Sequence, residues 1–317
     1  MTREQITYLV FGAVLLLALV FDLGLLSKKN HKVTIREALL QTFFWVGLAL
    51  AFLVFLWLEN GQTTALEYLS GYLMEWSLSI DNIFVFILIF TSFSVKEKYY
   101  PRVLLIGILM AILFRIIFIT VGVALVHQFE WILYIFGVFL VYTGYKMFAT
   151  DEEDNFNPET SQAYKFVKKI FPLSMTDGNG KFRIIENGKT VYTTLFVVVM
   201  MLASIDLVFA LDSIPAVMGI SRDKMVIYTS NIFAVLGLRS LFFLLRGAVN
   251  KFEYLQQGIA IVLIFIGLKM LGAHWFDKWL NSTMQVFISL GIIIICITSS
   301  VLFSMVKNKK RDKLQVD

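Results

Sequence analysis

Cysteine, histidine and charged residues are scarce in this sequence. It contains one cysteine and three histidines, and 16% of its residues are charged against 58% that are hydrophobic. Because Cys296 stands alone, no disulfide can form within the chain. The histidines fall in connections or at the ends of apolar stretches, so a zinc or copper site inside those stretches would lack its usual ligands. The shortage of charge excludes an ordinary soluble domain.

Long apolar stretches take up most of the chain instead. A hydrocarbon core of about 30 Å needs roughly 20 helical residues for each crossing. Nine stretches meet this need, at 6–26, 35–58, 66–93, 103–126, 129–148, 193–220, 225–245, 255–271 and 284–306. Their apolarity is continuous rather than alternating, which excludes the strands of an outer-membrane barrel. The sequence predicts an all-α integral membrane protein of about nine transmembrane helices, with 1–317 as a single transport domain.

Lysine and arginine are enriched in alternate connections between these stretches. They gather near 28–36, 96–102, 165–189 and 246–251 and in the tail after 306, whereas the other connections are poor in them. Such enrichment is typical of the cytoplasmic side. With an odd number of crossings, the bias predicts an external N-terminus and a cytoplasmic C-terminus. The basic loops face one side of the lipid bilayer and so give no reason to expect a nucleic-acid partner.

Two acidic pairs lie inside the apolar stretches. Glu75 and Asp81 are six residues apart in the third stretch, and Asp206 and Asp212 have the same spacing in the sixth. A carboxylate within a bilayer costs a few kcal/mol or more and usually serves an ion, proton or substrate pathway. These acids therefore predict a transport site. A purely structural role, in which they neutralise buried arginines, is the alternative.

Three features recur in the same order in two parts of the chain. Each acidic pair is followed by an arginine in the next stretch, Arg115 or Arg239, and by a Gly-x-Lys-Met ending in the stretch after it. Because the offset is an odd number of crossings, the second unit must run through the membrane in the opposite sense. The pattern predicts an inverted three-helix repeat of helices 3–5 and 6–8, typical of secondary transporters. The two repeats are 66–148 and 193–272.

The connection at 149–192 is the one long segment of soluble character. It begins with an acidic run, continues through an amphipathic stretch, and contains Asn187-Gly188 between alternating residues. Asn-Gly in this setting predicts a two-residue β-hairpin. The DGNGK stretch from Asp177 is interpreted as a simple turn rather than a calcium loop, because Gly188 stands where the bidentate acid would be needed. We expect this segment to form a cytoplasmic cap.

Helix geometry limits how the acids can share an ion. Six residues on an unbroken helix rise about 9 Å and rotate about 240°, so one ion cannot bridge both acids of a pair. We therefore expect partners from opposite repeats, with Asp81 meeting Asp212 and with Glu75 and Asp206 on opposite sides of that crossing. The alternative is a helix that breaks between its acids, which Pro215 favours in the sixth stretch.

The candidate ligands supply oxygen alone. Carboxylates with amide and hydroxyl groups suit manganese, magnesium or calcium. The candidate metal ligands are Glu75, Asp81, Asn82, Asp206, Asp212, Ser213 and Asn231, and the candidate charge partners are Arg115 and Arg239. The three uncharged ligands have an alternative role as hydrogen-bond partners between helices. Lys146 and Lys269 lie near helix ends and are expected to extend to the membrane interface as anchors.

Four long motifs resemble the TerC/Alx family of bacterial integral membrane proteins. They are EWSLSIDNIFVF, FALDSIPAV, SNIFAVLGLRSLFFLL and IVLIFIGLKMLG, and the resemblance extends over nearly the whole chain. It implies a multi-pass protein of the bacterial inner membrane in the LysE-like transporter group, linked to tellurite resistance, alkaline response and manganese export. The four acids match the family's intramembrane acids. Ala203 departs from the pattern, since many members have a glutamate there.

These observations predict a secondary transporter rather than an enzyme. It would export manganese or a related hard divalent cation, with proton exchange as the coupling and with no cofactor besides the transported ion. The alternative is a membrane scaffold or stress-response assembly factor that transports nothing itself. An intramembrane aspartyl protease is disfavoured because neither aspartate pair has the required motifs, and GNGKFR lacks the spacing of an ATP-binding loop.

Overall fold

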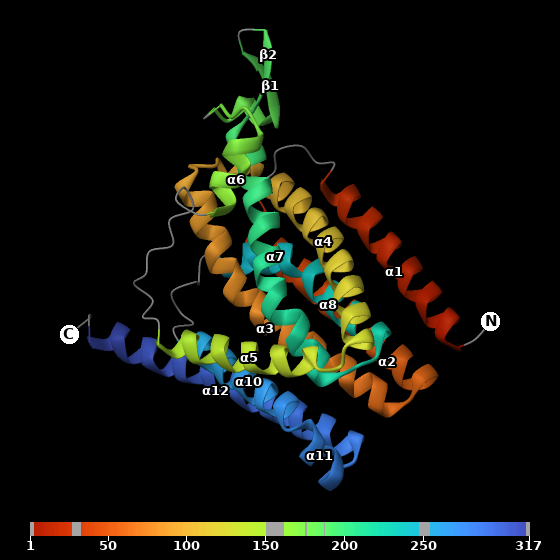
Figure 1. Ribbon diagram of the computed structural model, residues 1–317. Helices are drawn as coiled ribbons and strands as arrows, with labels where there is room; N and C mark the ends of the chain where they lie inside the picture. The colour runs from red at the N-terminus through yellow and green to blue at the C-terminus, as the bar shows by residue number, and fades with distance from the viewer. Residues whose placement is uncertain are drawn as a thin grey trace.

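The computed structural model is a bundle of helices with one small hairpin at its edge (Figure 1). The structure describes residues 3–26, 33–149, 162–174, 176–186, 188–246 and 254–314. The side chains of some residues within these ranges, including Asp81, lie outside the described part. The elements are α1 (Arg3–Leu26), α2 (Ile35–Asn60), α3 (Gln62–Ser92), η1 (Glu97–Tyr99), α4 (Tyr100–Gln128), α5 (Ile132–Ala149), α6 (Gln162–Ile170), η3 (Gly178–Gly180), β1 (Arg183–Glu186), β2 (Lys189–Tyr192), α7 (Thr194–Ile220), α8 (Lys224–Leu236), α9 (Leu238–Leu245), α10 (Leu255–Leu271), α11 (Ala273–Trp279) and α12 (Ser282–Leu314).

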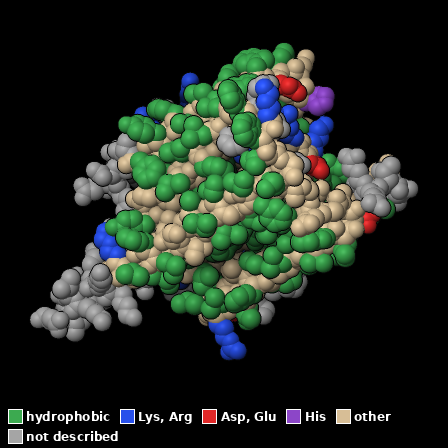
Figure 2. Space-filling view, turned by 90° about the horizontal axis from the view of Figure 1, so that it is seen from below, with side chains coloured by type: hydrophobic (Ala, Val, Ile, Leu, Met, Phe, Trp, Pro, Cys, Tyr) green, Lys and Arg blue, Asp and Glu red, His purple; other side chains and the backbone are tan. Residues whose placement is uncertain are grey.

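Six helical segments of the described chain are long and apolar enough to cross a membrane. They are Ile35–Asn60, Gln62–Ser92, Glu97–Gln128, Thr194–Ile220, Lys224–Leu245 and Thr283–Lys307, and three shorter apolar helices cover Gln5–Val20, Ile132–Phe148 and Leu255–Leu271. Large hydrophobic side chains lie exposed along these helices. Figure 2 shows one such face, on which hydrophobic side chains predominate. The helical membrane class is confirmed, while the nine crossings, the inverted repeat and the orientation stay predictions.

The predicted hairpin is present in the long connection. Strands β1 and β2 pair antiparallel, with Glu186 opposite Lys189 at the end of the ladder. Gly188 has a φ of +74°. A glycine takes this left-handed conformation without the steric cost of a side chain, which is why the Asn-Gly signal identified the turn.

The segment before the hairpin packs on the beginning of α4. Arg102 donates from Nη1 to the carbonyl of Gly180 at 3.1 Å, and its guanidinium lies over the Phe182 ring. Lys96 Nζ lies 2.6 Å from Asp177 Oδ2. The hydrogen bond from Lys96 lowers the pKa of the Asp177 carboxyl from its ordinary value. Lys96 is exposed and Asp177 is partly exposed, so this surface ion pair contributes little to stability.

Helices α3 and α7 run antiparallel through the centre of the bundle. Glu67 of α3 bonds Ser221, which directly follows α7, and Gly71, four residues after Glu67, packs on Val217, four residues before Ser221. A Cβ at Gly71 would lie 2.9 Å from Ser230 Oγ of α8. The absence of a side chain at Gly71 therefore allows three helices to approach one another closely.

Helices α5 and α10 form a second close pair, which lies across one end of α7 in Figure 1. A Cβ at Gly144 would lie 2.7 Å from the Ala260 carbonyl oxygen, and a Cβ at Gly267 would lie 2.7 Å from that of Gly137. Small residues that permit backbone contact are the usual basis of helix association in membranes. This pair carries the two Gly-x-Lys-Met endings that the sequence analysis singled out.

The structure corrects two expectations about helix continuity. Helix α7 continues unbroken through both of its acids and through Pro215, as α3 does through its own pair, so the broken-helix alternative is wrong. A transmembrane helix can continue through a proline, because neighbouring helices, hydroxyl side chains or small local adjustments can satisfy the backbone group that the proline frees. The interruption occurs instead within the predicted 225–245 helix, where α8 ends and α9 begins on either side of Gly237.

Candidate functional site

Arg115 lies at the centre of a buried cluster of charged residues contributed by four helices. Its guanidinium binds Asp206 of α7 through two bonds, Nε to Oδ2 at 2.7 Å and Nη2 to Oδ1 at 3.0 Å. Its Nη1 donates to Glu75 Oε2 of α3 at 2.7 Å and to Asn231 Oδ1 of α8 at 2.9 Å. Asn231 Nδ2 donates in turn to Glu75 Oε1 at 2.5 Å. The predicted repeats thus contribute one acid each to the cluster.

The burial of this cluster makes its charge balance important. Arg115, Glu75 and Asp206 are each at most 1% exposed, and Asn231 is fully buried. Two carboxylates against one guanidinium leave one formal negative charge among these side chains. The two-pronged contact with Asp206 is the strongest geometry that arginine offers a carboxylate. Removal of the guanidinium would leave two carboxylates without compensation in a medium that solvates them poorly.

The cluster corrects the expected arrangement of Glu75 and Asp206. Helix spacing had placed them on opposite sides of an Asp81–Asp212 crossing, but both carboxylates bind the same guanidinium. The prediction considered α3 and α7 alone, whereas a long arginine side chain from α4 reaches both acids. The Asp81 side chain is outside the described part of the structure, so its pairing with Asp212 stays a prediction.

Asp212 lies apart from the Arg115 cluster. It is partly exposed, accepts a hydrogen bond from Thr143 Oγ1 of α5 at 3.2 Å, and interacts electrostatically with Lys146 one turn further along α5. The neighbouring Ser213 is buried, and its hydroxyl has no hydrogen-bond partner among the described residues. The same is true of the buried Ser79 hydroxyl on α3. These oxygens are therefore unused acceptors beside the predicted ligands.

Two further predicted residues, Asn82 and Arg239, are also buried. No described hydrogen bond or ion pair links them to the Arg115 cluster. Asn82 lies on α3 at 3% exposure, and Arg239 lies on α9 at 4%. Within the described part of the chain, no three Asp, Glu, His or Cys side chains come together as a metal centre. The full set of predicted ligands is therefore not assembled around one point by the side chains that the structure describes.

A second charged site, which the sequence analysis missed, lies at the other end of α3. Glu67 Oε2 accepts a hydrogen bond from Ser221 Oγ at 2.5 Å and interacts electrostatically with Lys269 of α10. Lys269 is 9% exposed and donates from Nζ to Ser289 Oγ of α12 at 3.2 Å. Lys269 is therefore held against neighbouring helices, and its anchoring at the membrane interface stays a prediction. The available signal was the position of Glu67, eight residues before Glu75 at the edge of an apolar stretch.

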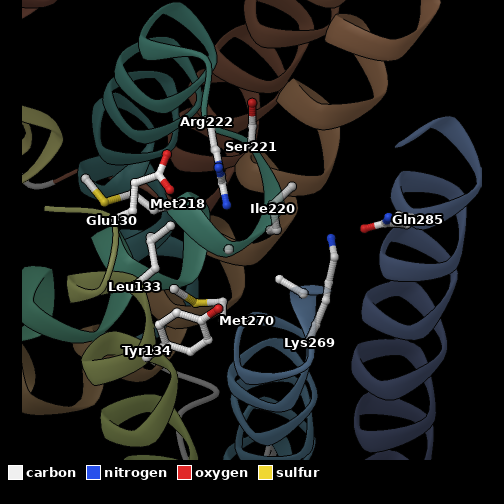
Figure 3. A pocket seen from close by; sticks show the side chains of 12 residues that line it. Glu130, Leu133, Tyr134, Met218, Ile220, Ser221, Arg222, Lys269, Met270 and Gln285 are labelled. Carbon is white, nitrogen blue, oxygen red and sulfur yellow. The ribbon is translucent and has the colours of Figure 1, made fainter. Parts of the chain in front are cut away.

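Two adjoining cavities are lined by Lys269, and Figure 3 shows the first of them. One, of about 200 Å³, is lined by Arg222, Glu130 and Ser221 among others, and the second, of about 240 Å³, by Glu67 and Asn281 among others. Both share Ile220, Lys269 and Gln285. In Figure 3 the Lys269 ammonium points toward the end of α7, and the Gln285 side chain extends toward it from α12.

Comparisons with known proteins identify similar membrane proteins. The model of the integral membrane protein TerC family matches residues 60–312. A membrane protein of Myxococcus xanthus is 39% identical over 94% of this chain and 92% of its own length. A Rickettsia bellii membrane protein is 36% identical over 97% and 99%. A Salmonella typhi protein named "Putative membrane-bound redox modulator Alx" is 36% identical over 96% and 95%. No solved structure gives a significant match.

Proposed function

We propose, from the premise that this chain belongs to the TerC family of integral membrane proteins, that it is a secondary transporter that exports manganese or a related hard divalent cation. The bacterial relatives and the membrane-spanning helices support a location in the bacterial inner membrane. The observation that carries the proposal is the pair of buried carboxylates, Glu75 and Asp206, that share one guanidinium where α3, α4 and α7 meet. A net negative charge at such a place is retained when it serves an ion pathway.

The donor atoms favour a hard cation. Carboxylate, amide and hydroxyl oxygens surround the centre of the bundle, and the buried Ser79 and Ser213 hydroxyls have unused lone pairs. Manganese, magnesium and calcium accept such ligands, and their flexible or octahedral coordination spheres can retain water where the protein supplies few oxygens. The chain has a single cysteine, so a thiolate site for a soft metal would have one sulfur ligand at most.

Among the predicted acids whose side chains the structure describes, Asp212 is best suited to bind the cation first. Glu75 and Asp206 are already bound by Arg115, and a cation must displace that guanidinium to reach them. Asp212 is partly exposed, and the hydrogen bond that it accepts from Thr143 is 3.2 Å long, longer than the bonds from Arg115 to Glu75 and Asp206. A cation held there would be close to Ser213, and Asp81 is the partner that the sequence predicts from the opposite repeat.

Exchange against protons is the coupling that we propose. Carboxylates that release a divalent cation into a low-dielectric interior are left with unfavourable charge, which protons or an internal basic group must neutralise. The basic loops support cytoplasmic placement of the hairpin end and the C-terminus. Under that orientation the ion enters from the hairpin end and leaves near α11.

The decisive experiment is manganese uptake into everted membrane vesicles under an imposed proton gradient. Asp212→Asn should reduce the rate of uptake at least tenfold, because it removes the charge that binds the cation while leaving the side-chain volume unchanged. The exposed Glu97→Gln, which removes an acid of η1 that lines neither cavity around Lys269, is the matched control and should transport normally. Uptake by the Asp212→Asn protein at the wild-type rate, with equal abundance in the membrane, would refute the proposal. Calcium and magnesium measured in parallel give the metal preference.

A scaffold or stress-response role is the second candidate. The feature that favours it is the docked segment of α6, β1 and β2, which extends from one end of the bundle in Figure 1 and offers a surface outside the membrane. Deletion of residues 151–190 separates the two candidates, because a transporter should retain much of its flux whereas a scaffold should fail. The Salmonella relative is named a redox modulator, but a dithiol reaction within one chain needs two cysteines and this sequence has one.

A further inference from the structure

We infer that Glu67 is the ligand of an exit-side site for the transported divalent cation. The ammonium of Lys269 neutralises the Glu67 carboxylate when no cation is bound there. The inference rests on the proposed function and extends it to a residue pair at the end of the bundle near α11. It is carried by the cavities around Lys269, by the burial of Lys269 and the partial burial of Glu67, and by the helices that hold them.

Glu67 has the surroundings of a cation ligand. Its carboxylate accepts a bond from the buried Ser221, and the second cavity beside it is also lined by the amide side chains of Asn281 and Gln285. Carboxylate, hydroxyl and amide oxygens are the ligands that a hard divalent cation takes from a protein, with water completing its shell. A cavity of about 240 Å³ has room for the ion with several of those waters.

Lys269 explains how this carboxylate is tolerated when the site is empty. Its ammonium interacts electrostatically with Glu67 and is held toward α12 by Ser289. An ammonium and a divalent cation carry charge of the same sign, so they compete for one carboxylate. The bond to Ser289 gives Lys269 a second partner to which the ammonium can withdraw.

The site is separate from the Arg115 cluster yet on the same helix. Glu67 lies eight residues before Glu75 on α3, a rise of about 12 Å. Between them, Gly71 brings α3 into close contact with Val217 and Ser230. A cation that leaves the centre of the bundle along α3 must pass this contact, and Glu67 is the first acid on the far side of it.

The test uses the full-length protein with Cys296→Ser and Lys278→Cys, so that a fluorophore is attached to an exposed position of α11 near the cavities. Bound manganese is paramagnetic and quenches a nearby fluorophore. In nanodiscs, quenching should saturate with manganese, and excess magnesium should reverse it. Glu67→Gln should raise the half-quenching concentration at least tenfold. Glu59→Gln, which removes an acid outside both cavities, should leave it unchanged.

Lys269→Met provides the second measurement. Removal of the competing ammonium should lower the half-quenching concentration several-fold, and that gain should vanish when Glu67→Gln is also present, because the two groups act on each other. An equal gain in both backgrounds would overturn the inference, as would a Glu67→Gln protein that quenches like the wild type. Asp212→Asn should leave quenching unchanged, since it affects the central site. Vesicle uptake reports separately on the proposed function, so a protein with intact uptake and Glu67-independent quenching refutes the exit site alone.

Discussion

Arg115→Gln is the substitution whose effect follows most directly from the structure. The change removes two bonds to Asp206, one to Glu75 and one to Asn231, and leaves two carboxylates buried with no cation between them. Loss of one partner of a buried ion pair costs about 3–5 kcal/mol. In chains of about 150–250 residues, each kcal/mol shifts Tm by about 2–4 °C. With the lower value of roughly 2 °C for this longer chain, the apparent Tm should fall by about 6–10 °C.

The assay is thermal unfolding of the purified protein in detergent, followed by tryptophan fluorescence. Arg115→Lys should lose less than Arg115→Gln, because it keeps the charge and gives up the two-pronged geometry. The triple variant Glu75→Gln, Arg115→Gln, Asp206→Asn should recover much of the stability, since no charge remains uncompensated. Arg222→Gln, at an exposed position, is the control and should unfold like the wild type.

The same thermal unfolding assay can be repeated with manganese present. If a divalent cation can take the place of the guanidinium, saturation of Arg115→Gln with manganese at about 100 times its Kd should return roughly 2.7 kcal/mol, or about 5 °C. The triple variant, which has lost its carboxylates, should gain nothing. An Arg115→Gln protein as stable as the wild type would refute the electrostatic reasoning. Equal stabilisation of both variants by manganese would refute the role of these two acids.

Two further predictions concern parts of the molecule outside the charged cluster. Gly144→Val should lower the apparent Tm by several degrees, because its Cβ would meet the backbone of α10 at 2.7 Å, whereas Gly12→Val, with open space around it, should have little effect in the same thermal unfolding assay. The depressed pKa of Asp177 means that its ion pair with Lys96 supports loop docking above the ordinary carboxyl pKa, and that this support is lost as the pH falls through the lowered value. Hydrogen exchange in residues 176–186, corrected for intrinsic rates, should therefore quicken in acid in the wild type, and Lys96→Ala should already show the faster exchange at pH 7.

The sequence was sufficient for features that depend on local pattern. Long apolar runs located the helices, and Asn187-Gly188 located the hairpin, because both signals reflect the preferences of neighbouring residues. The members of the central cluster were also identified, since Glu75, Asp206 and Arg115 are costly within a membrane. Their pairing was not, because it depends on the reach of a side chain from a third helix.

Glu67 and Lys269 escaped prediction for a different reason. Charged residues near helix ends normally reach water, so the sequence gives no reason to assign them a buried role. Only the packing of α10 and α12 around this end of α3 shows that Lys269 is buried. The interruption at Gly237 was equally hidden, since a single glycine is common within transmembrane helices.

The described contacts of the intramembrane acids favour an exchanger over an open pore. Glu75 and Asp206 share Arg115, Asp212 interacts with Lys146, and Glu67 interacts with Lys269. These four acids and three basic groups leave one formal negative charge, and each basic group comes from a helix other than those of the acids it neutralises. A cation that binds any of these acids therefore competes with a positive group that belongs to the protein. Under the proposed function, movement of that group back to its acid would expel the ion, so that release and neutralisation would occur in the same step.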